Sequence, residues 1–476
     1  MLSSGAVVED VAGRGAAGAR RRVVWWRLLL VASLGAVSVA AKGPSTAAPA
    51  GQSEAGFTAP VVVSEEDTAE PGIDAAHDGT LYVNAPVRLL PGLLGSASLL
   101  WRSDDGGGTW ALTPPGLRAA FPGGGDSDVA VDPGNGTVYF SDLWGGSSTA
   151  SVSEDKGETW FASPLSGLPI HDRQWLATPG GGVVYLTYGQ IPLGVMVSKS
   201  VDGGRTFLAH SIAVSVADRS GCLCPPGTMV VDAADPSAEL ADRVGVVYAT
   251  STGGIGFARS EDGGSTFVQV PIAPDRQGVD TMRAFPVVAS ADGDRLVAVW
   301  QESVEDQRTL VQFSDSPDWG ASWSEPRVLV DEGTPLFPWV DANDAGKVAV
   351  SLYHTDQVTL PDTAPEEAVW FERYLESLDG GQTFSPLVTV DPEPVKTGPI
   401  CTAGANCTED RELLDFQAVA VDGEGMANVA WTRSVDNVAD TQIRFAKQQA
   451  GGAPEPATTI VRLERTVEDV VTGLLP

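Results

Sequence analysis

The sequence predicts an all-β protein, a β-propeller of seven four-stranded antiparallel blades that spans residues 57–450. Three observations support this prediction. A short motif recurs six times at intervals of about 50 residues, which is the length of one propeller blade. Seven segments have the pattern of a β-hairpin, with two short apolar strands around a polar turn. The chain of 476 residues also contains 54 glycines and 33 prolines, which is typical of a protein with many turns.

The recurring motif reads S-x-D-x-G-x-T-[W/F], as in SDDGGGTW from Ser103. Four further copies fit without a gap, and SDSPDWGASW from Ser314 is interpreted as a stretched variant with a two-residue insertion. Aspartate, serine and threonine side chains bond nearby backbone in turns, glycine allows tight conformations, and an aromatic ring packs between sheets. We therefore expect a structural turn between the third and fourth strands of a blade at each of Asp105, Asp155, Asp202, Asp262, Asp318 and Asp379.

The seven hairpins outnumber the six motifs, and this difference indicates how the ring closes. The hairpin that begins at Gln417 has no motif after it. A blade that is built from both ends of the chain lacks the covalent turn before its fourth strand, so we expect that strand near residues 59–63. Closure of this kind leaves no exposed sheet edge. A six-bladed ring is the alternative, if one hairpin is an insertion.

Both ends of the chain carry segments outside the propeller. Three arginines at 20–22 precede an apolar stretch that ends in small residues, which is the pattern of a secretory signal peptide. We expect residues 1–41 to contain an N-terminal extension and this signal, cleaved near Ala40, and residues 42–56 to form a flexible linker. An uncleaved membrane anchor is the alternative. Residues 451–476 are predicted to form a tail with a short amphipathic helix, because apolar residues recur there at helical spacing.

The net charge of −32, from 62 acidic and 30 basic residues, argues against nucleic acid as a partner. Export would place the mature chain, without a membrane span, in an oxidising environment where disulfides form. Cys401 and Cys407 flank a five-residue loop and are predicted to pair, whereas a bridge between Cys222 and Cys224 would be strained. No metal-ligand spacing or cofactor motif is found, so neither a metal nor a cofactor is predicted.

The motif resembles the Asp-box, or bacterial neuraminidase repeat, of the sialidase-like superfamily. The resemblance covers nearly all of residues 57–450 and implies a propeller that recognises glycans. Sialidases hold the substrate carboxylate with three arginines, use a tyrosine paired with a glutamate as nucleophile, and use an aspartate as acid and base. The arginine that this family has in its first blade is absent, and Glu70 stands in that region. This departure favours either a substrate other than sialic acid or binding without catalysis.

Three arginines precede the innermost strands of the third, fifth and seventh hairpins, so we expect them to face the central mouth of the propeller. Arg173, Arg283 and Arg411 would together create an anion-binding site in an otherwise acidic protein. In the alternative interpretation each arginine pairs with a nearby acid, namely Asp172, Asp280, and either Asp410 or Glu412.

The resemblance also implies catalytic candidates: Tyr353 with Glu302 as the nucleophile pair, and Asp172 as acid and base. Asp126 and Asp128, before the second hairpin, are further acidic candidates. The first functional hypothesis is an exported sialidase-like glycoside hydrolase that acts on an extracellular glycan or polysaccharide. The second is a non-catalytic binding or scaffold propeller, and the third is a lyase or hydrolase of different chemistry that uses the acids of the mouth.

Overall fold

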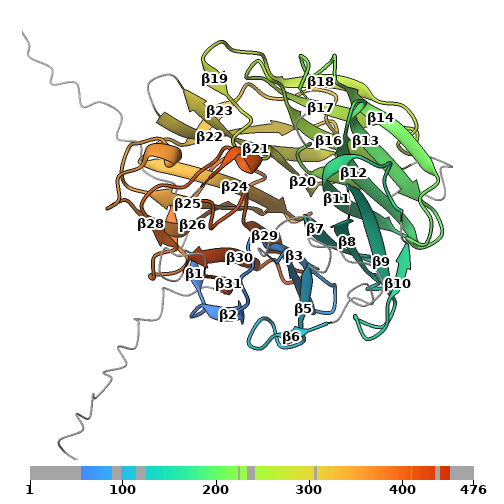
Figure 1. Cartoon of the computed structure of the whole chain (residues 1–476), viewed down its shortest axis with the longest axis horizontal. Coiled ribbons are helices and arrows are strands. Elements are labelled where there is room, and N and C mark those ends of the chain that lie inside the picture. Colours follow the sequence, from blue (N-terminus) through green and yellow to red (C-terminus); the bar gives the residue numbers. More distant parts are fainter. Residues whose placement is uncertain are drawn as a thin grey trace, which may run out of the picture. The chain divides into compact units, whose positions relative to one another are not determined.

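The computed structural model describes residues 55–87, 98–113, 125–144, 146–163, 165–222, 226–232, 242–304, 308–408, 410–434 and 440–450. These residues form a seven-bladed propeller of antiparallel sheets, as the sequence predicts (Figure 1). The predicted signal peptide, most of the linker and the predicted C-terminal helix lie outside the described residues. In the part of the chain that is described, no helix is long and apolar enough to cross a membrane.

The strands of the first four blades follow one another from the innermost outward. Blade 1 contains β3 (Gly72–Ala75), β4 (Leu81–Ala85), β5 (Leu99–Ser103) and β6 (Ala111–Leu112). Blade 2 contains β7 (Ser127–Val131), β8 (Val138–Trp144), β9 (Ser147–Ser153) and β10 (Phe161–Ser163). Blade 3 contains β11 (His171–Gly180), β12 (Val183–Gln190), β13 (Gly194–Ser200) and β14 (Ala209–Ser215). Blade 4 contains β15 (Met229–Asp232), β16 (Arg243–Ala249), β17 (Ile255–Ser260) and β18 (Val268–Ala273).

The last three blades carry additional short elements. Blade 5 contains β20 (Val287–Asp292), β21 (Arg295–Val304), β22 (Arg308–Ser316) and β23 (Arg327–Val330), and β19 (Val279–Asp280) also pairs with β21. Blade 6 contains β24 (Thr334–Ala342), β25 (Val348–Thr355), β26 (Val369–Ser377) and β27 (Val388–Thr389), and β28 (Lys396–Thr397) also pairs with β26. Blade 7 contains β29 (Ala418–Val421), β30 (Ala427–Ser434) and β31 (Thr441–Gln449). Two 3₁₀ turns, η1 (Pro361–Thr363) and η2 (Gly404–Asn406), lie in the connections.

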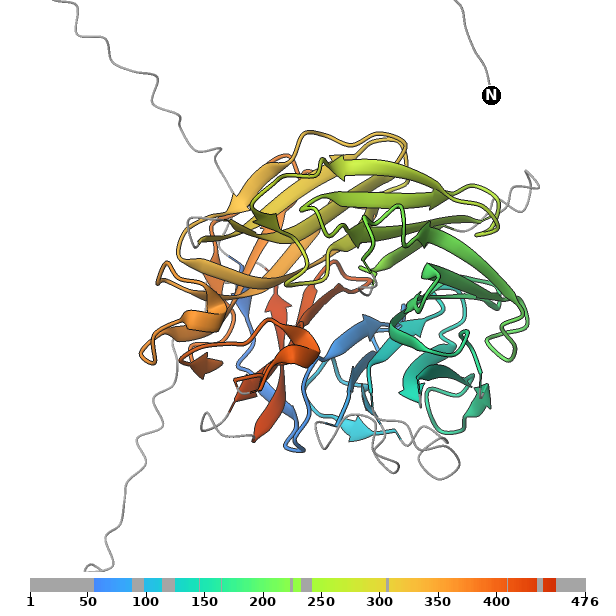
Figure 2. The same ribbon diagram turned by 45° about the horizontal axis from the view of Figure 1, so that its top comes forward.

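The N-terminal strands close the ring on blade 7. Strand β2 (Val61–Ser64) pairs antiparallel with β31, with Val61 opposite Phe445, and β1 (Gly56–Phe57) pairs with the end of the same strand. Figures 1 and 2 show these blue strands beside the red strands of blade 7. The prediction of the closing strand from the missing seventh motif is therefore confirmed. The outermost strand of this blade and its inner three strands come from opposite ends of the propeller region.

Apolar side chains between neighbouring blades form the core. Between blades 5 and 6, for example, Phe313 of β22 packs in one cluster with Val350 and Leu352 of β25. Burial of such a side chain contributes roughly 1.5–3 kcal/mol. The same arrangement recurs around the ring, and the innermost strands contact one another in sequence around the axis. Each blade is thus held mainly by its two neighbours.

The motif forms a self-contained turn in blade after blade. In the first copy, Asp105 Oδ1 accepts hydrogen bonds from Ser103 Oγ at 2.8 Å and from Thr109 N at 2.9 Å, and Oδ2 accepts one from Thr109 Oγ1 at 2.7 Å. Ser103 Oγ in turn accepts a hydrogen bond from the N–H of Gly107. Gly107 has a φ of 92°, and a side chain there would collide with the ring of Phe445. The remaining copies repeat these bonds around Asp155, Asp202, Asp262, Asp318 and Asp379.

The prediction of a stretched sixth copy is wrong. Ser316, not Ser314, occupies the serine position, because its Oγ bonds Asp318 at 2.9 Å and accepts the N–H of Gly320 at 2.8 Å. Ser322 then takes the threonine position. The segment from Ser316 therefore fits the motif without an insertion, and Ser314 belongs to strand β22.

A second set of aspartates joins the innermost strands of neighbouring blades. The carboxylate of Asp74 accepts a hydrogen bond from Val131 N at 2.7 Å, and that of Asp128 accepts one from Leu176 N at 2.7 Å. Asp341 accepts one from Val421 N at 2.6 Å. Burial is the main cause that raises the pKa of Asp74 to about 7 and those of Asp128 and Asp341 to about 6.

These two sets of aspartates predict a stability maximum near pH 4. Hydrogen bonds from Thr109 and Thr159 are the main cause that lowers the pKa of Asp105 and Asp155 to about 2, so their contribution is present above an unfolded value of about 4 and is lost as the pH falls toward 2. Asp74, Asp128 and Asp341 have raised pKa values, so their contribution is complete below about pH 4 and is lost as the pH rises through about 6 to 7. Urea unfolding midpoints measured across this range should therefore fall on both sides of the maximum.

One variant tests whether a buried aspartate causes the loss of stability toward neutral pH. Asp74→Asn keeps an oxygen for Val131 N but removes the titrating group, so the loss of stability between pH 5 and about 8 should become smaller. Asp344→Asn, in an exposed hairpin turn, is the matched control and should leave the profile unchanged. An Asp74→Asn profile that is identical to the wild-type profile would contradict this assignment.

Candidate active site

The candidate site lies where the innermost strands begin, at the end of the central axis that forms the mouth of the propeller. Strands β3, β7, β11 and β29 meet around this axis in Figure 1. Glu70 precedes β3, Asp126 precedes β7, Arg173 lies at the start of β11, and Asp415 precedes β29. The motif turns connect the third and fourth strands at the opposite end of the blades. The mouth and the motif turns are therefore spatially separate features.

His171 fixes the start of β11 next to the site. Its Nδ1 lies 2.7 Å from the carbonyl oxygen of Leu168, and its Nε2 lies 2.6 Å from Ser148 Oγ. A carbonyl only accepts hydrogen bonds, so Nδ1 carries the proton and Nε2 accepts the bond from the Ser148 hydroxyl. Burial lowers the pKa of His171, which favours this neutral form. The ring thereby anchors the backbone that leads into Asp172 and Arg173.

Arg173 is the central cation of the mouth, and its side chain is only 2% exposed. Its backbone has a φ of 44°, a left-handed conformation that is uncommon for a residue with a side chain. The guanidinium donates a hydrogen bond to Ser127 O at 3.2 Å, lies 4.0 Å from the carboxylate of Glu70, and stacks 3.6 Å above the ring of Trp175. These contacts hold the positive charge beneath the surface of the mouth.

Asp126 and Asp172 form a carboxyl pair around one backbone amide. The N–H of Arg173 donates to Asp126 Oδ2 at 3.1 Å and to Asp172 Oδ1 at 3.0 Å. The two side chains also interact directly, which raises the pKa of Asp126. Burial is the largest cause of the shift to about 6, while the charge of Arg173 opposes it. Asp172 is exposed. The pair therefore offers a proton-holding group near neutral pH beside a carboxylate that reaches solvent.

Glu70 and Asp415 extend the acidic cluster onto blades 1 and 7. Glu70 Oε1 accepts a hydrogen bond from Asp415 N at 3.0 Å, and the carboxylate of Asp415 pairs with Arg411. Burial, together with the charges of Asp415 and Asp126, raises the pKa of Glu70 well above its usual range. Burial also raises the pKa of Asp415, although Arg411 opposes the shift. The positive charges of Arg173 and Arg411 oppose the shift of the Glu70 pKa, because they favour its ionised carboxylate.

Four aromatic rings form the floor of the mouth. The ring of Trp175 lies 5.4 Å from those of Phe285, Trp339 and Phe416, and Trp339 stacks on Phe416 at 5.1 Å. The four residues come from blades 3, 5, 6 and 7. This cluster fills the axis beneath the charged groups, so the acidic side chains lie above an apolar surface.

The three predicted arginines do not form one anion site. Arg173 and Arg411 belong to the same cluster, because both influence the pKa of Glu70. Arg283 lies apart from them, with its Nε 2.8 Å from Asp280 and its Nη1 3.9 Å from Asp362. All three are ion-paired, as the alternative interpretation expected, but the partners of Arg173 and Arg411 are Glu70 and Asp415 rather than their adjacent acids.

The structure does not pair Tyr353 with Glu302. Tyr353 in β25 is fully buried, and its hydroxyl accepts a hydrogen bond from Thr432 N at 3.0 Å. Glu302 in β21 is also fully buried, and its carboxylate binds Arg276, Trp300 and Gln312. The two side chains are packed on different blades and do not face the mouth together. Burial raises the pKa of Tyr353 well above its usual range, so the hydroxyl stays protonated.

The predicted disulfide between Cys401 and Cys407 is confirmed, with the Cα atoms 5.9 Å apart. Cys222 is also disulfide-bonded, and Cys224 lies outside the described residues. Within the described ranges, no group of three or more histidine, cysteine, aspartate or glutamate residues is arranged to hold a metal ion. The acidic cluster of the mouth is instead organised by arginine side chains and backbone amides.

No protein-family model and no curated protein sequence matches the chain. Solved structures with a similar fold include an α-L-arabinofuranosidase from Fusarium graminearum, with a TM-score of 0.47 and 11% identity over 82% of this chain and 97% of that chain. A sialidase from Streptococcus pneumoniae has a TM-score of 0.42 and 10% identity over 82% and 69% of the two chains. A GH74 enzyme from Niastella koreensis has a TM-score of 0.46 and 16% identity over 78% and 52%. At these identities the likeness concerns the fold alone.

Proposed function

We propose that the protein is an exported glycoside hydrolase whose mouth binds a neutral or cationic glycan, with the Asp126–Asp172 pair as acid and base. The observation that carries this proposal is the shared amide of Arg173, which holds two carboxyl groups together. Burial is the main cause that raises the pKa of Asp126 to about 6, and the neighbouring Asp172 adds to it. A general acid needs a proton near its working pH, and a neighbouring carboxylate is a common way to retain it.

The charge of the mouth supports an uncharged or positively charged ligand over a sialoside. Arg173, Arg283 and Arg411 are each already ion-paired. The acids outnumber them: Glu70, Asp126, Asp172, Asp280, Asp362 and Asp415. A carboxylate ligand would therefore have to displace an existing pair in the field of a chain with a net charge of −32. Sugar hydroxyls, in contrast, donate hydrogen bonds to carboxylates.

Asp126→Asn and Asp172→Asn should each lower kcat by roughly 10²–10⁴-fold, which is the usual contribution of a positioned acid or base. The assay is turnover of a panel of aryl glycosides that includes neutral sugars, an amino sugar and a sialoside. In the wild type, activity that requires protonated Asp126 should fall as the pH rises through about 6. In Asp172→Asn the neighbouring negative charge is lost, which should lower the pKa of Asp126. Any remaining activity should therefore fall at a lower pH than in the wild type. Asp344→Asn, in an exposed turn, should match the wild type.

One observation favours a non-catalytic binding propeller as the second candidate. Asp126 and Asp172 contact each other directly, whereas the two carboxyl groups of most glycosidases lie roughly 5–9.5 Å apart across the bond that is cleaved. In that case the panel would give no turnover, but calorimetry with the same sugars would detect binding that weakens in Asp172→Asn. Turnover that is unchanged in both aspartate variants would contradict the first proposal.

A further inference from the structure

A groove of about 360 Å³ opens between blades 5 and 6 at the mouth end of the propeller. Its volume lies at the lower end of the range of roughly 300–1,000 Å³ that small-ligand sites occupy. Three segments line it, and they include Asp280 and Arg283, Val304, and Leu360, Pro361 and Asp362. The groove is thus separate from the carboxyl pair but lies at the same end of the blades.

The walls of the groove combine a fixed polar group with an apolar surface. Arg283 is 40% exposed, and its guanidinium is held between Asp280 and Asp362. Asp362 is itself fixed, because its carboxylate accepts hydrogen bonds from Thr402 N at 2.9 Å and Thr402 Oγ1 at 2.6 Å. Valine, leucine and proline side chains form the remaining wall. A sugar ring presents both hydroxyl groups and C–H faces, so this mixture of charged pairs and apolar side chains suits it.

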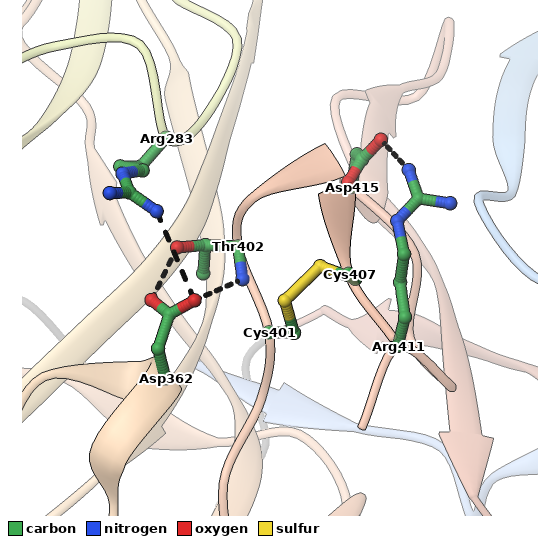
Figure 3. Close-up of a disulfide and its surroundings, with 7 residues drawn as sticks. All are labelled: Arg283, Asp362, Cys401, Thr402, Cys407, Arg411 and Asp415. Atoms are coloured by element: carbon green, nitrogen blue, oxygen red, sulfur yellow. Dashed lines mark hydrogen bonds and ion pairs between the residues drawn. A yellow bond between two sulfur atoms is a disulfide. The ribbon is translucent and has the colours of Figure 1, made fainter. Parts of the chain in front are cut away.

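Two connections join the groove to the mouth. Phe285 follows Arg283 by two residues and packs on Trp175 in the aromatic floor. On the other side, Thr402 follows Cys401, whose N–H bonds Asp410 O at 2.9 Å just before Arg411. Figure 3 shows Arg283, Asp362 and Thr402 on one side of the Cys401–Cys407 disulfide, and Arg411 with Asp415 on the other. The same loop therefore borders both sites.

We infer that the ligand is an oligosaccharide chain that occupies both sites, rather than a single terminal sugar. The mouth takes the unit beside the carboxyl pair, and the groove between blades 5 and 6 takes a further unit of the same chain. This inference rests on the proposed function, because it assumes that a glycan occupies the mouth. Arg283 acts in it as a residue that determines chain-length preference, through hydrogen bonds to sugar hydroxyls.

The test is a length series of neutral oligosaccharides, namely the mono-, di-, tetra- and hexasaccharides of gluco-, xylo- and arabino-series, with binding measured by calorimetry. Affinity of the wild type should rise with chain length until the groove is filled. Arg283→Ala and Asp362→Asn should each lower the affinity for the long chains by about tenfold, as loss of a charged hydrogen bond predicts, and should leave the short chains unaffected. Arg205→Ala is the matched control, because that arginine is also ion-paired and 43% exposed but lies at the opposite end of blade 3.

The outcomes separate this inference from the proposed hydrolysis. Binding does not require cleavage. If affinity rises with chain length in the wild type but not in the groove variants, the inference is supported even if no glycoside is turned over. Equal affinity of the wild type for all lengths, or equal losses for short and long chains in the groove variants, would overturn it while leaving hydrolysis at the mouth open to the aspartate variants. No binding of any neutral sugar in the series would overturn this inference, while turnover of the amino-sugar glycoside would still test the proposed function. Thermal unfolding of each variant shows whether a loss of binding reflects a loss of fold.

Discussion

Arg173→Ala should lower the free energy of unfolding by about 3–5 kcal/mol, which is the usual cost of breaking a buried ion pair by removal of one partner. The guanidinium has almost no exposure, bonds Ser127 O, and faces the carboxylate of Glu70 at 4.0 Å. Its loss would leave the carbonyl of Ser127 without this donor and would open a space above the ring of Trp175. Urea unfolding at neutral pH measures the change.

Two further variants identify the source of this effect. Arg173→Lys should recover only part of the stability, because an ammonium group lacks the planar fork that both stacks on Trp175 and donates to Ser127. Arg205→Ala, which removes an exposed ion pair with Glu154, should leave the unfolding midpoint close to that of the wild type. If Arg173→Ala behaved like Arg205→Ala, the guanidinium would not be an organising cation of the mouth.

The fold could be predicted because its signals are local. A hairpin and a motif turn are each specified within about fifteen residues, and both recur once in each blade at similar intervals. The closing strand could also be predicted from the sequence, because the hairpin at Gln417 has no motif after it. The register of the sixth turn was missed for a simple reason. Ser314 and Ser316 are both serines near one aspartate, and only the spacing to Asp318 and Gly320 distinguishes them.

The site was predictable in part, and the limits have a physical cause. Residues before an innermost strand lie at the mouth by topology, which is why Arg173, Asp172 and Arg411 could be placed there from the sequence. Their partners could not, because Glu70 and Asp415 meet only when the first and last blades close the ring. Tyr353 and Glu302 were selected by resemblance. Whether a strand residue faces the mouth or a neighbouring blade depends on strand twist and register, and the sequence pattern alone does not determine these.

Val63→Asp should be the most disruptive change at the point where the ring closes. Val63 in β2 is 7% exposed and packs in one cluster with Leu81 and Trp101 of blade 1 and with Ile443 of blade 7. An unpaired carboxylate among these apolar side chains should lower the free energy of unfolding by about 3–5 kcal/mol. The closing strand would then detach more readily and expose the edge of β31.

The neighbouring residue supplies the control for this prediction. Val62 lies on the same strand but is 36% exposed, so Val62→Asp should change the free energy of unfolding by no more than about 0.5 kcal/mol. Urea unfolding and limited proteolysis of the two variants, compared at pH 7 and at pH 4, measure the difference. The defect of Val63→Asp should shrink at the lower pH, because a buried carboxyl group has a raised pKa and enters the interface in its neutral form. Equal losses of stability in the two variants would mean that β2 is held by its backbone pairing alone, and that burial of this valine does not close the ring.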